Sequence, residues 1–379
     1  MSLTLNAEQT MLRDNARQLV RENAPVSQLR SLRDRKDATG FSADFWRKMA
    51  ELGFAGTIVP EAYGGTGLGY TELGVVMEEC GHTLASTPLL STVLLCGGAL
   101  LEGGTEEQKK ALLPGICEGE TIMALAFEEA RRFDPYEVAT KAEKSGSGYR
   151  LTGQKTFVLD GHVANKLIVS ARTSGAQGDR DGITLFLVDA GQKGVKIERT
   201  VMVDSRNAAK VKLEAVDVPA SAVLGKVDKG ADVLDPVIDR ATICLSAEML
   251  GLISHAYETT IEYLKTRVQF DALIGTFQAL QHRAVEMFCQ LELAKSVVMD
   301  ALSAIDDKRD DVAVSASAAK ARLTDCSRLI TREAVQMHGG IGMTDEHDIG
   351  LYLKRGASAE LTFGDSAYHR DRFARLKGF

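Results

Sequence analysis

The sequence has few of the residues that hold small secreted domains together or bind metals. Its 379 residues include one tryptophan, seven prolines and six cysteines, and aromatic residues make up 6%. No two cysteines form a Cys-x-x-Cys pair, and no histidine has ligand spacing with a cysteine or carboxylate on an identifiable helix face. We therefore predict reduced, mostly buried thiols and no metal site.

Basic residues are also fewer than acidic residues. Lysine and arginine number 45 against 52 acidic residues, which gives a net charge of −7. A surface that binds nucleic acid needs clustered basic side chains, and no such cluster occurs along the chain. We therefore predict no nucleic-acid partner.

Long apolar runs and targeting signals are missing as well. The longest apolar run, residues 89–101, has 13 residues and contains serine, threonine and glycine, whereas a transmembrane helix needs about 20 apolar residues. The first ten residues have neither a basic n-region nor an apolar h-region. We predict a buried helix at 89–101, no membrane-spanning segment and a cytoplasmic location.

The composition is that of an ordinary globular protein. The period of the hydrophobic pattern changes along the chain. The period is helical before about residue 122, alternates as in strands to about 227, and is helical again afterwards. No helical segments separate the strand-like runs, which favours an antiparallel barrel or sandwich over a Rossmann sheet. We predict an α+β protein with an N-terminal helical domain (1–122), a central β-domain (123–227) and a C-terminal helical domain (228–379).

The most informative stretch runs from Ile238 to Arg283. Its apolar residues recur at steps of three and four, which predicts a long buried helix, a tight turn and the start of a second helix. The pair Asp239 and Arg240 is predicted to open the first helix. By pattern alone, this is a core helix with solvated charges at its ends.

Six segments carry a family resemblance when they are taken together and in order. They are GFAGTIVPEAYGGTGLG, GTEEQKKALLPGICEGE, TGQKTFVLDGHVANKLIVSART, VDVPASAVLG, RVQFDALIGTFQALQ and AVQMHGGIG. With them the chain resembles the acyl-CoA dehydrogenase family over essentially its whole length. The resemblance implies that family's fold with a C-terminal four-helix bundle, a tetramer, FAD at a dimer interface, an acyl-CoA substrate and an electron-transfer flavoprotein as partner.

One set of matched residues concerns FAD held by the neighbouring subunit. Arginine pairs diphosphate oxygens as a fork, and adjacent glycines let a backbone approach a ligand closely. The alternative for the glycine pair is a plain turn between two helices. The resemblance assigns six residues to this role: Arg267, Phe270, Gln278, Gln336, Gly339 and Gly340.

The catalytic base departs from the family pattern. The position of the usual glutamate holds Gly364, and Asp365 stands next to it. Some members place the base on the central helix, one residue before an arginine near the CoA, and Asp239 followed by Arg240 matches that arrangement. Aspartate is shorter than glutamate by one bond, about 1.5 Å. The alternative is that Asp239 caps its helix and complements the helix dipole, and both interpretations stay open here.

The loop that faces the flavin in the family also differs. Phe127 and Phe133 replace its threonine and serine, and Phe157 replaces the next flavin-facing tryptophan. We expect Phe127 and Phe157 to contact the flavin through backbone amides and stacking, and Phe133 to lie near the substrate. This pattern, with FGDSAYHR at 363–370, resembles the β-type subunits of heteromeric acyl-CoA dehydrogenases, which act on bulky steroid or dicarboxylic thioesters.

Two functions stay open at this point. The favoured one is FAD-dependent α,β-dehydrogenation of an acyl-CoA thioester, with Asp239 as the preferred base and Asp365 as the other candidate. The alternative is a non-catalytic or half-site subunit that completes the FAD site of a partner chain in a heterotetramer. A flavin oxidase that uses oxygen is less favoured, because no residue argues for oxygen access.

Overall fold

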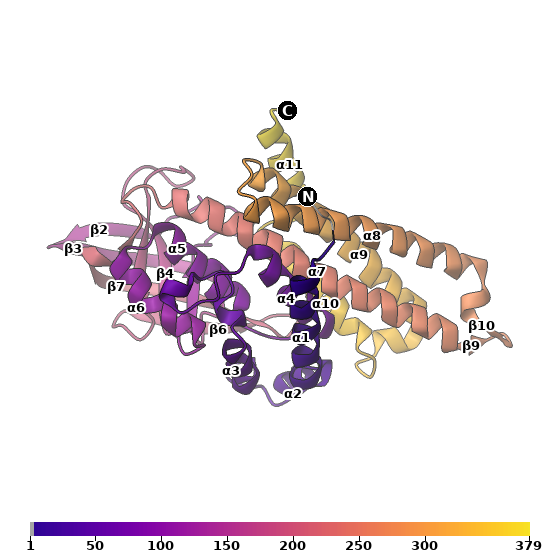
Figure 1. The fold of residues 1–379 in the computed structure, drawn as a ribbon. Helices are drawn as coiled ribbons and strands as arrows, with labels where there is room; N and C mark the ends of the chain where they lie inside the picture. Colours follow the sequence, from indigo (N-terminus) through magenta and orange to yellow (C-terminus); the bar gives the residue numbers. More distant parts are fainter. Residues whose placement is uncertain (1–3) are drawn as a thin grey trace. The chain divides into compact units, whose positions relative to one another are not determined.

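The computed structural model describes residues 4–379, so the first three residues of the N-terminal segment lie outside the described part. Two compact units are present, and each is drawn in Figure 1. The helical unit comprises residues 1–31, 70–86 and 242–379, and the sheet unit comprises residues 32–69 and 87–241. Among the described residues, no helix is long and apolar enough to cross a membrane.

The helical unit is built on long helices with polar ends. Asn6 and Gln9 form the capping box that opens the first helix, at 2.8 and 3.0 Å, as their spacing predicts. A two-stranded hairpin, β9 (Val268–Gln269) and β10 (Ala272–Leu273), joins two of the helices. The helices are α1 (Ala7–Asn23), α4 (Tyr70–Thr83), the main part of α7 (Ala231–Thr266), α8 (Gln278–Asp306), α9 (Val312–His338), α10 (Ile349–Leu361) and α11 (Ser366–Lys377).

Helices α4 and α7 touch backbone to backbone in this unit. A Cβ built on Gly81 would lie 2.0 Å from the carbonyl oxygen of Glu248. A Cβ on Gly251 would lie 1.8 Å from the carbonyl oxygen of Glu78. Any side chain at either glycine would therefore push the two helices apart.

The sheet unit has one open, mixed sheet. Hydrogen bonds give the strand order β6-β7-β3-β2-β4-β5-β8, with β1 paired to β4. The pairings of β1 and of β2 with β4 are parallel and the others are antiparallel. The strands are β1 (Met123–Ala126), β2 (Lys141–Ser145), β3 (Gly148–Leu159), β4 (Lys166–Arg172), β5 (Ile183–Asp189), β6 (Val195–Val201), β7 (Asn207–Pro219) and β8 (Val223–Leu224).

Alternation along the strands produces the core of this unit, as the sequence predicts. On β7, Val211 and Leu213 are buried whereas Lys210 and Lys212 are exposed. The sheet is open rather than closed into a barrel, because hydrogen bonds leave β6 and β8 as its two ends.

Helices complete the sheet unit. Residues 89–97 form a buried helix with π-type turns, which confirms a buried helix in the longest apolar run. The Thr105–Gln108 capping box opens α6. The helices of this unit are α3 (Ala43–Glu51), η1 (Phe54–Gly56), η2 (Glu61–Tyr63), η3 (Leu89–Gly97), α5 (Gly98–Gly103), α6 (Glu106–Cys117) and the start of α7, and α2 (Val26–Asp34) has residues in both units.

The prediction that Asp239 and Arg240 open α7 is wrong. The helix begins at Ala231, so Asp239 and Arg240 lie more than two turns inside it and do not open it. Pro236, the sixth residue of α7, has no N–H to donate to the carbonyl oxygen of Asp232, yet the helix continues through it.

The glycine contact gives a first testable prediction. Gly251→Ala should lower the free energy of unfolding by about 1–3 kcal/mol, because the added methyl group meets the backbone of α4. Urea denaturation measures the effect. Gly191→Ala is the control, since nothing lies within 4 Å of a Cβ at that position. Equal stability of the two variants would contradict the close contact.

Candidate functional site

The turn from Phe363 to Asp365 occupies the position of the missing glutamate. Phe363 and Gly364 both have left-handed backbone angles, with φ of 60° and 101°. A Cβ on Gly364 would lie 2.5 Å from Cδ1 of Tyr368. Only glycine fits this conformation without strain, so the turn has no room for an acidic side chain at residue 364.

Two buried side chains hold this turn through its carbonyl groups. The ammonium of Lys320 donates to the carbonyl oxygens of Gly364 and Glu360, both at 2.8 Å. The Nε2 atom of His369 lies 2.9 Å from the carbonyl oxygen of Phe363, as its donor. Burial lowers the pKa of Lys320 to about 7 and that of His369 to about 3, so His369 is neutral at pH 7.

The two candidate carboxylates have different surroundings. Asp365 is exposed and caps α11, because its side chain accepts from the backbone N–H of Tyr368 at 2.9 Å. Asp239 is only 6% exposed and lies in the interior of α7. The interpretation of Asp239 as a helix cap is therefore wrong, and the capping aspartate is Asp365.

Arg240 has a carboxylate partner within the sheet unit. Its Nη1 atom lies 2.8 Å from Oε2 of Glu102 on α5, and both side chains are half-buried. This ion pair orients the guanidinium beside the start of α7. An anionic substrate group at Arg240 would share it with Glu102.

Three phenylalanines lie on the loop and strand matched to the family's flavin contacts. The rings of Phe127 and Phe133 pack edge to face, 6.2 Å apart at 80°. Phe157 has a left-handed backbone, with φ of 51°, at a bulge between β3 and β7. Bulges and strained residues are frequent next to active sites, where they redirect a side chain.

A buried ion pair under this loop was missed by sequence reasoning. Lys155 is 0% exposed, and its ammonium contacts Oε1 of Glu129 at 2.6 Å and Oγ of Ser170 at 2.8 Å. Glu129 also accepts from the backbone N–H groups of Ala139 and Thr140. The available signal was the phase of β3, because Lys155 falls on the same face as buried Leu151.

The adjacent Glu128 also has an unusual environment. The residue is half-buried, and desolvation raises its pKa to about 8. A carboxyl group with that pKa is mostly protonated at pH 7.

The residues assigned to a neighbour's cofactor are gathered at one end of the helical unit, beside the hairpin in Figure 1. Phe270 and Asp271 form the hairpin turn with φ of 53° and 56°. Phe270 is 89% exposed, and the side chain of Arg267 is exposed without an ion pair among the described residues. Gln278 is the first residue of α8, whose N-terminus has no side-chain cap.

The glycine pair lies close to this end of α7. Tyr263, one turn before Arg267, stacks on His338 with ring centres 4.4 Å apart and donates to its carbonyl oxygen at 3.3 Å. Gly339 follows with φ of 63° and ψ of −140°, a conformation that only glycine adopts readily. Gln336, Gly339 and Gly340 are all exposed, and a Cβ on either glycine would meet open space.

One cavity lies elsewhere in the sheet unit and contains none of the predicted site residues. It has a volume of about 900 Å³ and is lined in part by Arg172, Lys141 and Tyr149. The guanidinium of Arg172 donates to backbone carbonyl groups, including those of Tyr136 and Asp181. Arg172 therefore supports the surrounding loops.

Three family models together match almost the entire chain. They describe the N-terminal domain (residues 6–120), the middle domain (123–216) and the C-terminal domain (228–377) of acyl-CoA dehydrogenases. The chain belongs to the acyl-CoA dehydrogenase family. It is 32% identical to the mitochondrial isovaleryl-CoA dehydrogenase of Pongo abelii, over 97% of this chain and 88% of that relative.

Solved structures of other acyl-CoA dehydrogenases share the fold. The Tcur3481–Tcur3483 steroid ACAD variant has a TM-score of 0.87 at 32% identity, covering 99% of this chain and 98% of that one. The ChsE4–ChsE5 complex of Mycobacterium tuberculosis has a TM-score of 0.90 at 26% identity, with 100% of both chains covered.

The cap assigned to Asp365 can be tested by stability alone. Asp365→Ala should lower the free energy of unfolding by about 1 kcal/mol, because the backbone N–H of Tyr368 loses its acceptor. Asp365→Asn should retain most of the free energy of unfolding, since asparagine is an equally good N-cap residue. Chemical denaturation of both variants is the measurement, and an unaffected Asp365→Ala protein would argue against the cap.

Proposed function

We propose that this chain is a subunit of an FAD-dependent acyl-CoA dehydrogenase in which Asp239 is the catalytic base. The buried position of Asp239 inside α7 is the observation that carries this proposal. A general base must be held in position beside the carbon that loses its proton, and a buried side chain inside a helix is held in that way.

The other carboxyl groups fit the role less well. Asp365 is exposed and its side chain is committed to the N-terminus of α11. Gly364 has no side chain, and the turn that contains it has no space for one. Asp239 is therefore preferred to Asp365 as the base.

The proposed reaction divides the work between the chain and its cofactor. Asp239 takes the proton from the α-carbon of the thioester and becomes a neutral carboxylic acid. When bound, FAD accepts the hydride that leaves the β-carbon. Because aspartate is about 1.5 Å shorter than glutamate, the thioester must lie closer to α7 than it would beside a glutamate base.

Residues at the hairpin end suit an FAD diphosphate from a neighbouring subunit. Arg267 supplies an exposed cation, and α8 begins at Gln278 without a side-chain cap at its N-terminus. Helix N-termini and arginine forks both attract phosphate oxygens. Phe270, exposed on a strained turn, gives an apolar surface that a cofactor or partner would cover.

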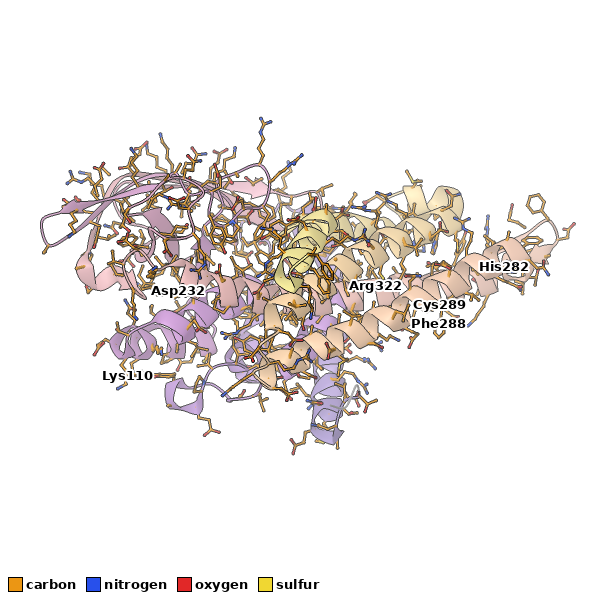
Figure 2. The ribbon with its side chains drawn as sticks, turned by 90° about the horizontal axis from the view of Figure 1, so that it is seen from above. Lys110, Asp232, His282, Phe288, Cys289 and Arg322 are labelled. Carbon is orange, nitrogen blue, oxygen red and sulfur yellow. The ribbon has the colours of Figure 1, made fainter. Side chains whose placement is uncertain are left out.

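The proposed assembly is a tetramer, either of identical chains or with a second acyl-CoA dehydrogenase chain. One face of α8 exposes Val285, Phe288 and Leu293, whose exposed fractions are 59%, 47% and 55%. Figure 2 shows Phe288 on this helix beside Cys289, which is also exposed. We propose that the apolar face is covered in the tetramer, and that an electron-transfer flavoprotein reoxidises the cofactor.

Asp239→Asn tests the base. Flavin reduction by acyl-CoA thioesters should fall by about 10²–10⁴-fold, the usual contribution of a general base, while bound FAD is unchanged. Anaerobic stopped-flow absorbance with a panel of thioesters of increasing bulk measures the rate.

The matched controls are Asp232→Asn and Asp365→Asn. Asp232 lies on the same helix and pairs with Arg180 at the surface (Figure 2), so its loss should leave the rate unchanged. Undiminished flavin reduction by the Asp239→Asn protein would exclude Asp239 as the base. Slow reduction by the Asp365→Asn protein would instead identify Asp365 as the base.

A half-site subunit is the second candidate function. The flavin-facing loop favours it, because Phe127 and Phe133 pack on each other where the family has hydroxyl groups. The residues for a neighbour's cofactor are meanwhile complete and exposed. In that case this chain completes a partner's FAD site and leaves its own empty.

Absorption spectra separate the two candidates. The independent enzyme should be yellow when purified alone, whereas the half-site subunit should be colourless until it is co-expressed with a partner chain. Arg267→Ala should weaken FAD binding about 10- to 100-fold in either case, from about 1.5–3 kcal/mol for charged hydrogen bonds.

Arg375→Ala is the control for charge, since Arg375 pairs with Asp371 on the exposed surface of α11. Full FAD occupancy in the Arg267→Ala protein would contradict the cross-subunit role. In the half-site case, Asp239→Asn in this chain should leave turnover by the complex unchanged.

A further inference from the structure

Two imidazoles and a carboxylate meet where α4 and α7 touch. His82 comes from α4, and His255 and Glu258 come from α7, one helical turn apart on the same face. Their ligand atoms all lie within 4.8 Å of one another. We propose that these three side chains bind a divalent transition-metal ion, with Zn²⁺ as the ion to test. The prediction of no metal site overlooked the three-residue spacing of His255 and Glu258 on α7, and His82 lies 173 positions from His255 in the sequence.

The scaffold beneath these side chains is rigid. The backbones of α4 and α7 are in contact at Gly81 and Gly251, directly beside His82 and one turn before His255. Glu248 of α7 forms a buried bidentate pair with Arg355 of α10, with two hydrogen bonds of 3.0 Å. The separation between His82 and His255 is therefore set by backbone contact.

Tyr352 on α10 contacts both histidines. Its ring stacks on His255, with centroids 4.9 Å apart and planes at 21°. Its hydroxyl donates to the backbone carbonyl oxygen of His82 at 2.7 Å. The two imidazole rings meet edge to face, with centroids 6.3 Å apart. The stacking restricts the ring of His255, and the hydrogen bond fixes the backbone of His82.

The three side chains are free to bind a ligand. No hydrogen bond joins either imidazole ring or the Glu258 carboxylate to another group in residues 4–379. Both imidazole rings are half-buried, and the Glu258 carboxylate is exposed.

The neighbouring charges are largely balanced. Arg17 and Lys295, which act on His82, pair with Glu79 and Glu292. Arg21 is exposed to solvent, and the carboxylate of Asp348 also acts on His255 with the opposite sign. Glu258 then supplies the negative charge that a divalent ion needs.

The ligand types select the ion. Two nitrogens and one carboxylate oxygen suit zinc and similar first-row ions, whereas Ca²⁺ and Mg²⁺ prefer oxygen alone. Ligand atoms at about 2.0–2.2 Å from zinc lie at most about 4.4 Å apart. The three ligand atoms lie within 4.8 Å of one another, slightly farther apart than this maximum. Because Glu258 is exposed, its side chain can rotate towards the histidines and shorten that separation. Water completes the coordination.

The test uses the full chain without a polyhistidine tag, after treatment with a chelator. Isothermal titration with Zn²⁺ should give saturable binding of one ion per chain, and Co²⁺ should give visible absorption bands. His82→Gln, His255→Gln and Glu258→Gln should each weaken binding at least about tenfold, since even outer-shell changes cost about 10–100-fold. No substrate or FAD enters the measurement, so its result is independent of the proposed function.

His282→Gln is the matched control, because His282 is an exposed histidine of α8 (Figure 2). Its binding of Zn²⁺ should equal that of the unmodified chain. Circular dichroism checks that each variant is folded. If a histidine variant unfolds, Glu258→Gln still tests the site, because Glu258 lies at the surface. The proposal is overturned if binding is not saturable, if Glu258→Gln binds normally, or if His282→Gln abolishes binding.

Discussion

The continuity of α7 past Pro236 is the constraint that sets the surroundings of Asp239 and the position of Arg267 in the chain. The helix runs from Ala231 to Thr266, with Pro236 near its start. Its continuity puts Asp239 in the helix interior, where its side chain is buried, instead of at an end where it would act as a cap. The same helix ends directly before Arg267 and the hairpin. A break at Pro236 would have given Asp239 a different environment and a different role.

Asp365, and not Asp239, is the aspartate that caps a helix. Its side chain accepts from the first turn of α11. Lys320 and His369 stabilise the preceding turn, since they hold the carbonyl groups of Gly364 and Phe363. The turn therefore has a conformation suited to glycine at residue 364.

The flavin-facing loop shows a similar coordinated change. Phe127 and Phe133 contact each other, so two polar positions have become one aromatic pair. Beneath the loop, the buried pair of Lys155 and Glu129 compensates two charges that would each be costly alone. Together these contacts give the loop a defined structure without the family's hydroxyl groups. They are consistent with an enzyme that has an apolar flavin pocket and with a subunit that serves a partner.

The sequence by itself determined the features that depend on neighbouring residues or on many positions together. The capping boxes at Asn6 and Thr105, the change of hydrophobic period and the family all follow from it. These signals act within one or two helical turns, or accumulate along the whole chain, and so can be read without coordinates.

Only the tertiary structure decided how distant side chains pair and which of them are buried. It revealed the start of α7, the cap at Asp365, the Lys155–Glu129 pair and the cluster of His82, His255 and Glu258. The physical reason is that desolvation, close helix contact and long-range pairing depend on groups that the chain brings together from far apart. The spacing of these residues in the sequence does not indicate which of them lie close together in space.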